Sequence, residues 1–99
     1  MRLVVVGSSP SWANAGEASS GYLVETAGGR LLLDCGHGVL SRLRALGGPA
    51  PDAIVLSHLH HDHWADLSQV VYGLLYGPLG WPRPTLLVPP GGLETIGRV

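Results

Sequence analysis

The chain has 99 residues, of which 13% are charged and 45% are apolar, and its formal net charge is -1. A chain of this length forms one small domain, which buries only about 60% of the surface that unfolding exposes. An average soluble domain has roughly 25% charged residues, so the low charge predicts that a partner or further polypeptide covers part of the apolar surface. The basic residues are scattered, which excludes a basic patch that would by itself indicate nucleic acid binding.

No segment of the sequence suits a membrane span or a secretion signal. The apolar residues 3–6 are too few for a signal peptide, and turn-forming residues follow them. The longest uncharged run, residues 67–82, is shorter than the about 20 residues that cross a bilayer, and it contains glycines and prolines. Cys35 is the single cysteine, which fits a reducing compartment. We therefore expect a cytoplasmic protein with no membrane partner.

The first half of the sequence predicts a small β unit followed by a helix. We expect strands at residues 2–6, 22–25 and 30–33. The glycine- and serine-rich loop at residues 7–21 could border a site. Gly28 and Gly29 supply the positive φ angles of a tight hairpin turn. Apolar spacing predicts a one-sided helix of about two turns over residues 39–46, which the Gly-Gly-Pro sequence at 47–49 ends.

The second half alternates strands with helices. Residues 53–56 are continuously apolar, as expected for a strand buried on both faces. From Trp64 onward the spacing predicts an amphipathic helix with Asp66 in its first turn. The apolar stripe of this helix comprises Leu67, Val70, Val71, Leu74 and Leu75. A strand at residues 85–88 and the start of another helix follow. This order predicts an α/β architecture with a site at the carboxyl ends of the strands.

A dense run of metal-ligand side chains follows the strand at residues 53–56. It contains His58, His60, Asp62 and His63. Residues two apart in an extended segment face the same way, so His58 and His60 can reach one ion together. The backbone must then turn, which places Asp62 and His63 where a second ion could sit roughly 3.5 to 4 Å from the first. The run therefore predicts one wall of a binuclear metal site.

Histidine and carboxylate ligands favour Zn2+, with Mn2+ or Fe as alternatives that this ligand set leaves open. Two ions that share a water lower its pKa to about 7, which produces a hydroxide nucleophile and predicts metal-assisted hydrolysis. Backbone N–H groups at the amino end of the helix from Trp64 could bind an anionic substrate.

Residues near the run have competing interpretations. His61 more often orients a ligand or faces solvent than binds metal. His37 is better explained as a loop histidine, and Cys35 as a small buried residue. Asp34 either orients a ligand histidine or caps the helix that follows it. The tryptophans at 12, 64 and 81 serve packing before substrate stacking. A structural role is favoured over phosphate contact for Ser8, Ser9, Ser19 and Ser20.

These residues resemble a known family. Residues 58–63, after an apolar strand, resemble the signature of the metallo-β-lactamase fold, and residues 33–38 resemble its strand-end Asp-Cys-Gly segment. Further segments resemble the ribonuclease Z and cyclic nucleotide phosphodiesterase branch. They are residues 7–10, Ser19 and Ser20 with residues 23–25, and residues 88–91. The resemblance covers most of the chain.

The resemblance implies half of a four-layer αββα sandwich, with a mixed sheet and helices on one face. Residues 1–99 would then form a single, truncated, amino-terminal part of the domain. The resemblance also implies that His58 and His60 bind one zinc, that Asp62 and His63 bind the second, and that Asp62 handles the proton of the attacking water. The family's further histidine, bridging aspartate and final histidine have no counterpart after Asp66.

The leading hypothesis is therefore a zinc-dependent phosphodiesterase that acts on RNA ends or cyclic nucleotides, to which this chain contributes an incomplete site. One alternative is a thioester or lactone hydrolase of the same fold. Another is a non-catalytic metal-binding or interaction module. The expected partners are a small phosphodiester or RNA substrate, and either a second copy in a homodimer or a missing carboxy-terminal half.

Overall fold

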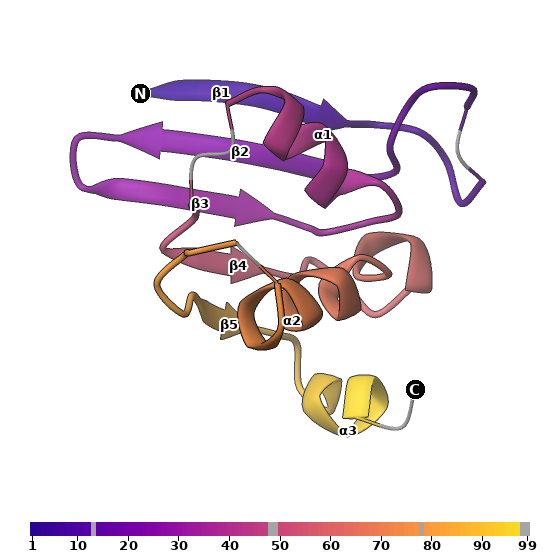
Figure 1. Ribbon diagram of the computed structural model, residues 1–99. Helices are drawn as coiled ribbons and strands as arrows, with labels where there is room; N and C mark the ends of the chain where they lie inside the picture. The colour runs from indigo at the N-terminus through magenta and orange to yellow at the C-terminus, as the bar shows by residue number, and fades with distance from the viewer. Residues whose placement is uncertain (13, 48–49, 78, 98–99) are drawn as a thin grey trace.

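The computed structural model describes residues 1–12, 14–47, 50–77 and 79–97, and within them the chain forms one mixed sheet with helices. The strands are β1 (Arg2–Gly7), β2 (Gly21–Thr26), β3 (Gly29–Leu33), β4 (Ala53–Val55) and β5 (Thr85–Leu87). They lie side by side in sequence order (Figure 1). The pairs β1–β2 and β2–β3 are antiparallel, whereas β3–β4 and β4–β5 are parallel. The prediction of a mixed sheet is confirmed.

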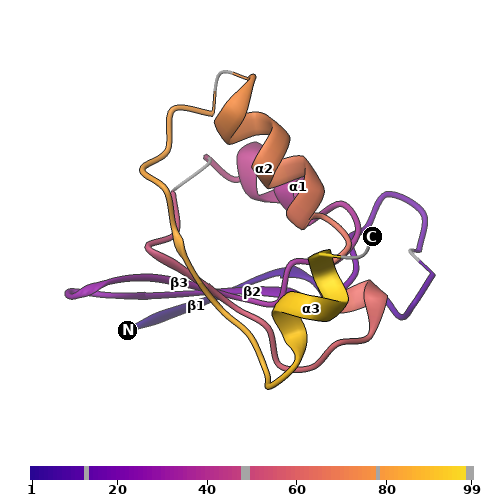
Figure 2. The ribbon, with the colours of Figure 1, turned by 90° about the horizontal axis from the view of Figure 1, so that it is seen from below.

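The helices are α1 (Val39–Ala45), α2 (Leu67–Leu75) and α3 (Gly92–Gly97), with a short 3-10 turn, η1, at His61–His63. α1 connects β3 to β4, and α2 connects β4 to β5, as parallel neighbours require. Figure 2 shows both helices on the same face of the sheet, as predicted. Within the described residues, no helix is long and apolar enough to cross a membrane.

The hydrophobic core lies between the sheet and these two helices. The central strands contribute Leu23, Leu32 and Ile54, which are register partners or neighbours and point to the same face. The helices contribute Val39, Leu43, Leu67 and Val70, all of which are buried. Burial of these side chains against one another is the main force that holds the helices on the sheet.

The opposite face of the sheet is apolar but uncovered by any described element. Leu3 and Val5 on β1 are 62% and 54% exposed, and Leu87 on β5 is 52% exposed. On β4 only Ile54 is buried, while Ala53 and Val55 are partly exposed. The prediction that this strand is buried on both faces is therefore wrong, because helices cover one face only.

Two local predictions also need correction. Thr26 pairs with Gly29, so the hairpin turn consists of Ala27 and Gly28, and of the two glycines only Gly29 has a positive φ, at 150°. In α2, Leu67 and Val70 are buried, whereas the outer members of the predicted stripe are exposed. These are Val71 and Leu75. The predicted helix end at 47–49 lies partly outside the described residues, although α1 does end at Ala45.

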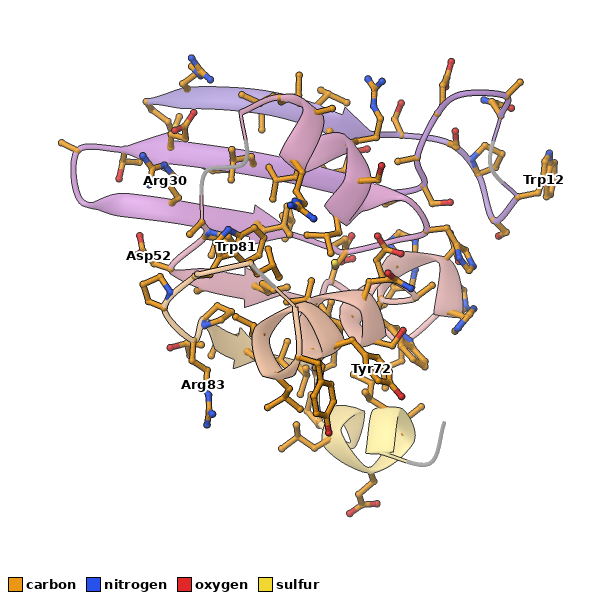
Figure 3. All side chains as sticks on the ribbon, viewed as in Figure 1. Trp12, Arg30, Asp52, Tyr72, Trp81 and Arg83 are labelled. Atoms are coloured by element: carbon orange, nitrogen blue, oxygen red, sulfur yellow. The ribbon has the colours of Figure 1, made fainter. Side chains whose placement is uncertain are left out.

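The tryptophans differ in their environments. Trp64 is buried, and Trp81 packs half-buried against the core, so packing is confirmed for both. Trp12 is 73% exposed and projects from the loop between β1 and β2 (Figure 3). The packing role predicted for Trp12 is wrong, because no described element lies against that loop tip.

We expect Leu32→Ala to lower the free energy of unfolding by about 2 to 5 kcal/mol, because truncation of a buried leucine leaves a cavity in the core. Urea unfolding followed by circular dichroism measures the change. Leu3→Ala, on the uncovered face, is the matched control, with an expected change within about 0.5 kcal/mol. Equal losses in the two variants would contradict this account of the core.

Candidate metal centre

The ligand run begins where the parallel strands β3 and β4 end. The β3–β4 ladder continues past the strands, since the amide of Asp34 donates to the carbonyl of Val55 at 2.8 Å. The ladder from β4 to β5 also continues, through the amide of Leu56 and the carbonyl of Leu87 at 2.9 Å. These carboxyl ends lie together at the right-hand edge of the sheet in Figure 1. The candidate residues therefore follow the carboxyl ends of the strands, where the sequence predicts the site.

After this edge the chain bends at Ser57 and His58, is extended at His60 and then tightens into η1. His60 has φ -64° and ψ 135°, and its carbonyl accepts the amide of His63 at 2.9 Å. The side chain of Leu59 lies against Gly92 of α3, and its carbonyl accepts the indole N–H of Trp64 at 3.0 Å. Leu59 thus packs against α3, whereas the rings of the neighbouring His58 and His60 lie close to each other.

The helix predicted from Trp64 begins only at Leu67. Residues before it bond to the segment after β3: the amide of Cys35 donates to the carbonyl of His63 at 2.7 Å, and the amide of Asp66 donates to the carbonyl of Cys35 at 3.0 Å. These bonds compete with a helical turn. The carboxylate of Asp66 accepts the amide of Leu40 at 2.8 Å, which ties α2 to α1.

The four predicted ligand residues lie together. The ring of His58 is 4.7 Å from that of His60 and 3.8 Å from that of His63, measured between centroids. Nε2 of His63 is 3.4 Å from a carboxylate oxygen of Asp62. His61 lies apart from this cluster, with its ring edge-on to Trp64 at 4.8 Å. His61 also packs against the exposed His37, at 5.2 Å between ring centroids.

Asp34 is the buried carboxylate that supports the cluster. Its oxygens accept the amide of Ser57 at 2.8 Å and the hydroxyl of Ser57 at 2.8 and 3.0 Å. One oxygen also contacts Nδ1 of His63 at 2.8 Å. Asp34 has a φ of 64°, a conformation that aspartate tolerates better than most residues. The alternative that Asp34 caps α1 is wrong, because Gly38 is the residue at that cap.

Cys35 is fully buried between these segments, as predicted. Burial raises the pKa of its thiol far above the ordinary value, and the negative charges of Asp66 and Asp34 raise it further. The thiol therefore stays protonated, which agrees with a packing role rather than with metal ligation.

The serine-rich loop is held by its own hydrogen bonds. The hydroxyl of Ser19 donates to the carbonyl of Pro10 at 3.2 Å, and the hydroxyl of Ser9 accepts the amide of Asn14 at 3.2 Å. Both serines are buried, which confirms the structural interpretation for them. The loop borders the site, because the carbonyl of Ser20 accepts the amide of Gly36 at 2.9 Å.

The donor chemistry of the cluster fits zinc, since three imidazoles and a carboxylate are borderline ligands of the type that zinc prefers. The contact with Asp34 engages Nδ1 of His63, so Nε2 is the nitrogen that would bind a metal ion. In the described part of the chain, no three such side chains converge on one point in their present rotamers.

The sheet topology, the helices on one face and the ligand run at the strand ends define a part of a metallo-β-lactamase fold. The metallo-β-lactamase fold protein YhfI from Bacillus subtilis superimposes with a TM-score of 0.78 and 33% identity, over 97% of this chain and 39% of that chain. A family model described as Anti-Pycsar protein Apyc1 matches residues 1–96. The chain belongs to the family that this model describes.

Sequence relatives agree with this assignment. The chain is 41% identical to the probable metallo-hydrolase YhfI of Bacillus subtilis strain 168, over 78% of this chain and 32% of the relative. It is 34% identical to a ribonuclease Z of Mycolicibacterium gilvum, over 97% of this chain and 35% of the relative. Zn2+-bound PqqB from Methylobacterium extorquens shares the fold, with a TM-score of 0.72 and 22% identity over 100% of this chain and 40% of that one. The chain spans about a third of the length of the curated relatives it matches.

Proposed function

We propose that the chain supplies His58, His60, Asp62 and His63 to a two-zinc site that hydrolyses phosphodiester bonds in RNA ends or cyclic nucleotides. The observation that carries this proposal is the clustering of these four side chains at the carboxyl edge of the sheet. Relatives named as a probable metallo-hydrolase and as ribonuclease Z support the reaction class. Bound zinc would supply Lewis-acid activation of water and neutralise charge on a phosphoryl oxygen.

The chain's own residues divide the work. Imidazoles of His58, His60 and His63 would bind the ions through the nitrogens that face the site. Asp62, whose carboxylate lies 3.4 Å from Nε2 of His63, would serve as a ligand. The family resemblance also assigns to Asp62 the proton of the attacking water. Asp62 and His63 are both half-buried, so their side chains are partly shielded from bulk solvent.

Further ligands would come from additional polypeptide or from a second copy of this chain. The uncovered apolar face of the sheet supports this part of the proposal, because an exposed apolar surface of that kind marks a contact region. A homodimer would place a second sheet against this face. A longer chain would cover the same face and carry the missing histidines and aspartate.

The test combines zinc content with hydrolysis of bis-para-nitrophenyl phosphate. We expect stoichiometric zinc in the unaltered protein. Loss of a residue that only hydrogen-bonds to a metal ligand weakens metal affinity by roughly 10- to 100-fold, and His60→Ala should weaken zinc affinity by more than this. His37→Ala, which removes an exposed histidine outside the cluster, is the matched control and should bind zinc normally.

Each result has a distinct meaning. Hydrolysis that depends on zinc and on His60 supports the phosphodiesterase proposal. Turnover of a thioester or lactone but not of the phosphodiester favours the carbonyl hydrolase. Zinc binding without turnover in any oligomeric state argues for a metal-binding module, and failure to bind zinc at all rejects the metal site.

A further inference from the structure

Ser57 lies directly before the ligand run and touches both Asp34 and His58. Its hydroxyl oxygen is 2.8 and 3.0 Å from the two carboxylate oxygens of Asp34 and 3.0 Å from Nδ1 of His58. A carboxylate only accepts hydrogen bonds, and a hydroxyl has one proton to give. The Ser57 proton therefore goes to Asp34, because two oxygens without a proton between them would repel at this distance.

This assignment decides the protonation of His58. Since Ser57 donates its hydroxyl proton to Asp34, a lone pair of the hydroxyl oxygen faces Nδ1 of His58. Nδ1 of His58 must therefore be the donor. The proton then occupies Nδ1 and leaves the Nε2 lone pair free. The hydrogen bond on one imidazole nitrogen thus selects which nitrogen can bind a metal ion.

The same carboxylate acts directly on a second histidine. Nδ1 of His63 lies 2.8 Å from Asp34 and donates to it, which leaves Nε2, 3.4 Å from a carboxylate oxygen of Asp62, as the nitrogen that could bind an ion. The rings of His58 and His63 lie 3.8 Å apart between centroids, and both are held through Asp34. One buried carboxylate can therefore set the tautomers of two candidate ligands, one by direct contact and one through a serine.

We propose that Ser57 is a positioning residue which, by relaying the hydrogen bond of Asp34 to His58, fixes the metal-binding tautomer of His58 in step with that of His63. This inference rests on the proposed function for its purpose at a metal site. It links the metal ion that His58 is expected to bind with the ion that His63 is expected to bind. The relay itself exists in the metal-free chain and can be measured there.

The experiment uses the 99-residue chain labelled with 15N at histidine, in chelator at pH 8.5, where an ordinary imidazole with a pKa near 6.5 is neutral. Long-range proton–nitrogen correlation spectra report the tautomer of each ring. We expect His58 and His63 to be protonated at Nδ1. In Ser57→Ala, His58 should revert to the Nε2-protonated form that predominates in water, while His63 should stay unchanged.

Two variants separate the relay from a general structural effect. Ser57→Thr keeps the hydroxyl and should restore the His58 tautomer. Ser68→Ala removes an exposed serine of α2 and should leave both rings as they were. Ser57→Ala keeps the backbone amide that donates to Asp34, so its fold should persist. Protonation of His58 at Nε2 in the unaltered chain, or an unchanged His58 in Ser57→Ala, would overturn the relay.

A zinc titration of the same variants connects the relay to the site. We expect Ser57→Ala to bind zinc roughly 10-fold more weakly and Ser57→Thr to recover the affinity. If the tautomer of His58 changes while zinc binding is absent from every variant, the relay stands and the proposed metal function fails. If zinc binds with His58 in the wrong tautomer, the relay fails and the metal function stands.

Discussion

Asp34→Asn should weaken zinc binding by roughly 10- to 100-fold, because an amide cannot replace both oxygens of the carboxylate. The side-chain NH2 group would face a donor, either the Ser57 hydroxyl or Nδ1 of His63. Competition with a chromophoric chelator measures the affinity. Asparagine tolerates the positive φ of this position, so the substitution tests the carboxylate rather than the backbone.

The same substitution should also lower the free energy of unfolding, by about 1 to 3 kcal/mol, since a buried hydrogen-bonding group loses its partner. Asp52→Asn is the matched control. The carboxylate of Asp52 accepts the amide of Arg30 at 2.7 Å, but it is exposed and lies at the opposite end of β4 from the cluster (Figure 3). Asp52→Asn should leave zinc affinity unchanged. An equal loss of zinc affinity in both variants would contradict the role assigned to Asp34.

Gly36→Ala should destabilise the fold and disturb the ligand run at the same time. A Cβ at this position would meet the carbonyl oxygen of Asp62, and would lie 2.8 Å from Cβ of Ser19 and 3.0 Å from the amide of Ser20. None of these atoms is the end of a flexible side chain. Backbone must therefore move, at an expected cost of about 1 to 3 kcal/mol or more.

The segment that moves contains Asp62 and His63, so we expect Gly36→Ala to lose zinc binding as well as stability. Urea midpoints and zinc titration test the two effects. Gly28→Ala is the control, because a Cβ in that exposed turn would meet only the hydroxyl of Thr26, at 3.7 Å. A Gly36→Ala protein with normal stability and zinc affinity would show that the close approach of residue 36 to Asp62 is unimportant.

Local patterns in the sequence were sufficient for the elements of the fold. Alternation and turn residues predict β1, β2 and β3, and the 3.6-residue spacing predicts α1 and most of α2. These predictions succeed because each depends on side chains that are neighbours along the chain. The predicted start of α2 at Trp64 is wrong because it also depends on local spacing alone. Hydrogen bonds from Cys35 to residues 63 and 66, which are distant in sequence, replace the first helical turn.

The candidate site divides in the same way. The candidate donors can be recognised from the dense run of His58, His60, Asp62 and His63, since such a combination of side chains has few other uses. The residues that hydrogen-bond to these donors could not be predicted, because Asp34 is equally compatible with a helix cap and Ser57 belongs to no motif. An Asp directly after a strand that pairs in parallel with the ligand strand is the signal that could have found this support.

The sequence by itself therefore predicted which side chains are candidate metal ligands and determined which strand leads to them, since both follow from residue type and short-range spacing. Only the tertiary structure decided how those side chains are oriented. Parallel pairing of β3 with β4 brings Asp34 to Ser57 and His63 across more than twenty intervening residues. Hydrogen bonds between such distant residues depend on the folded sheet, and no local pattern records them.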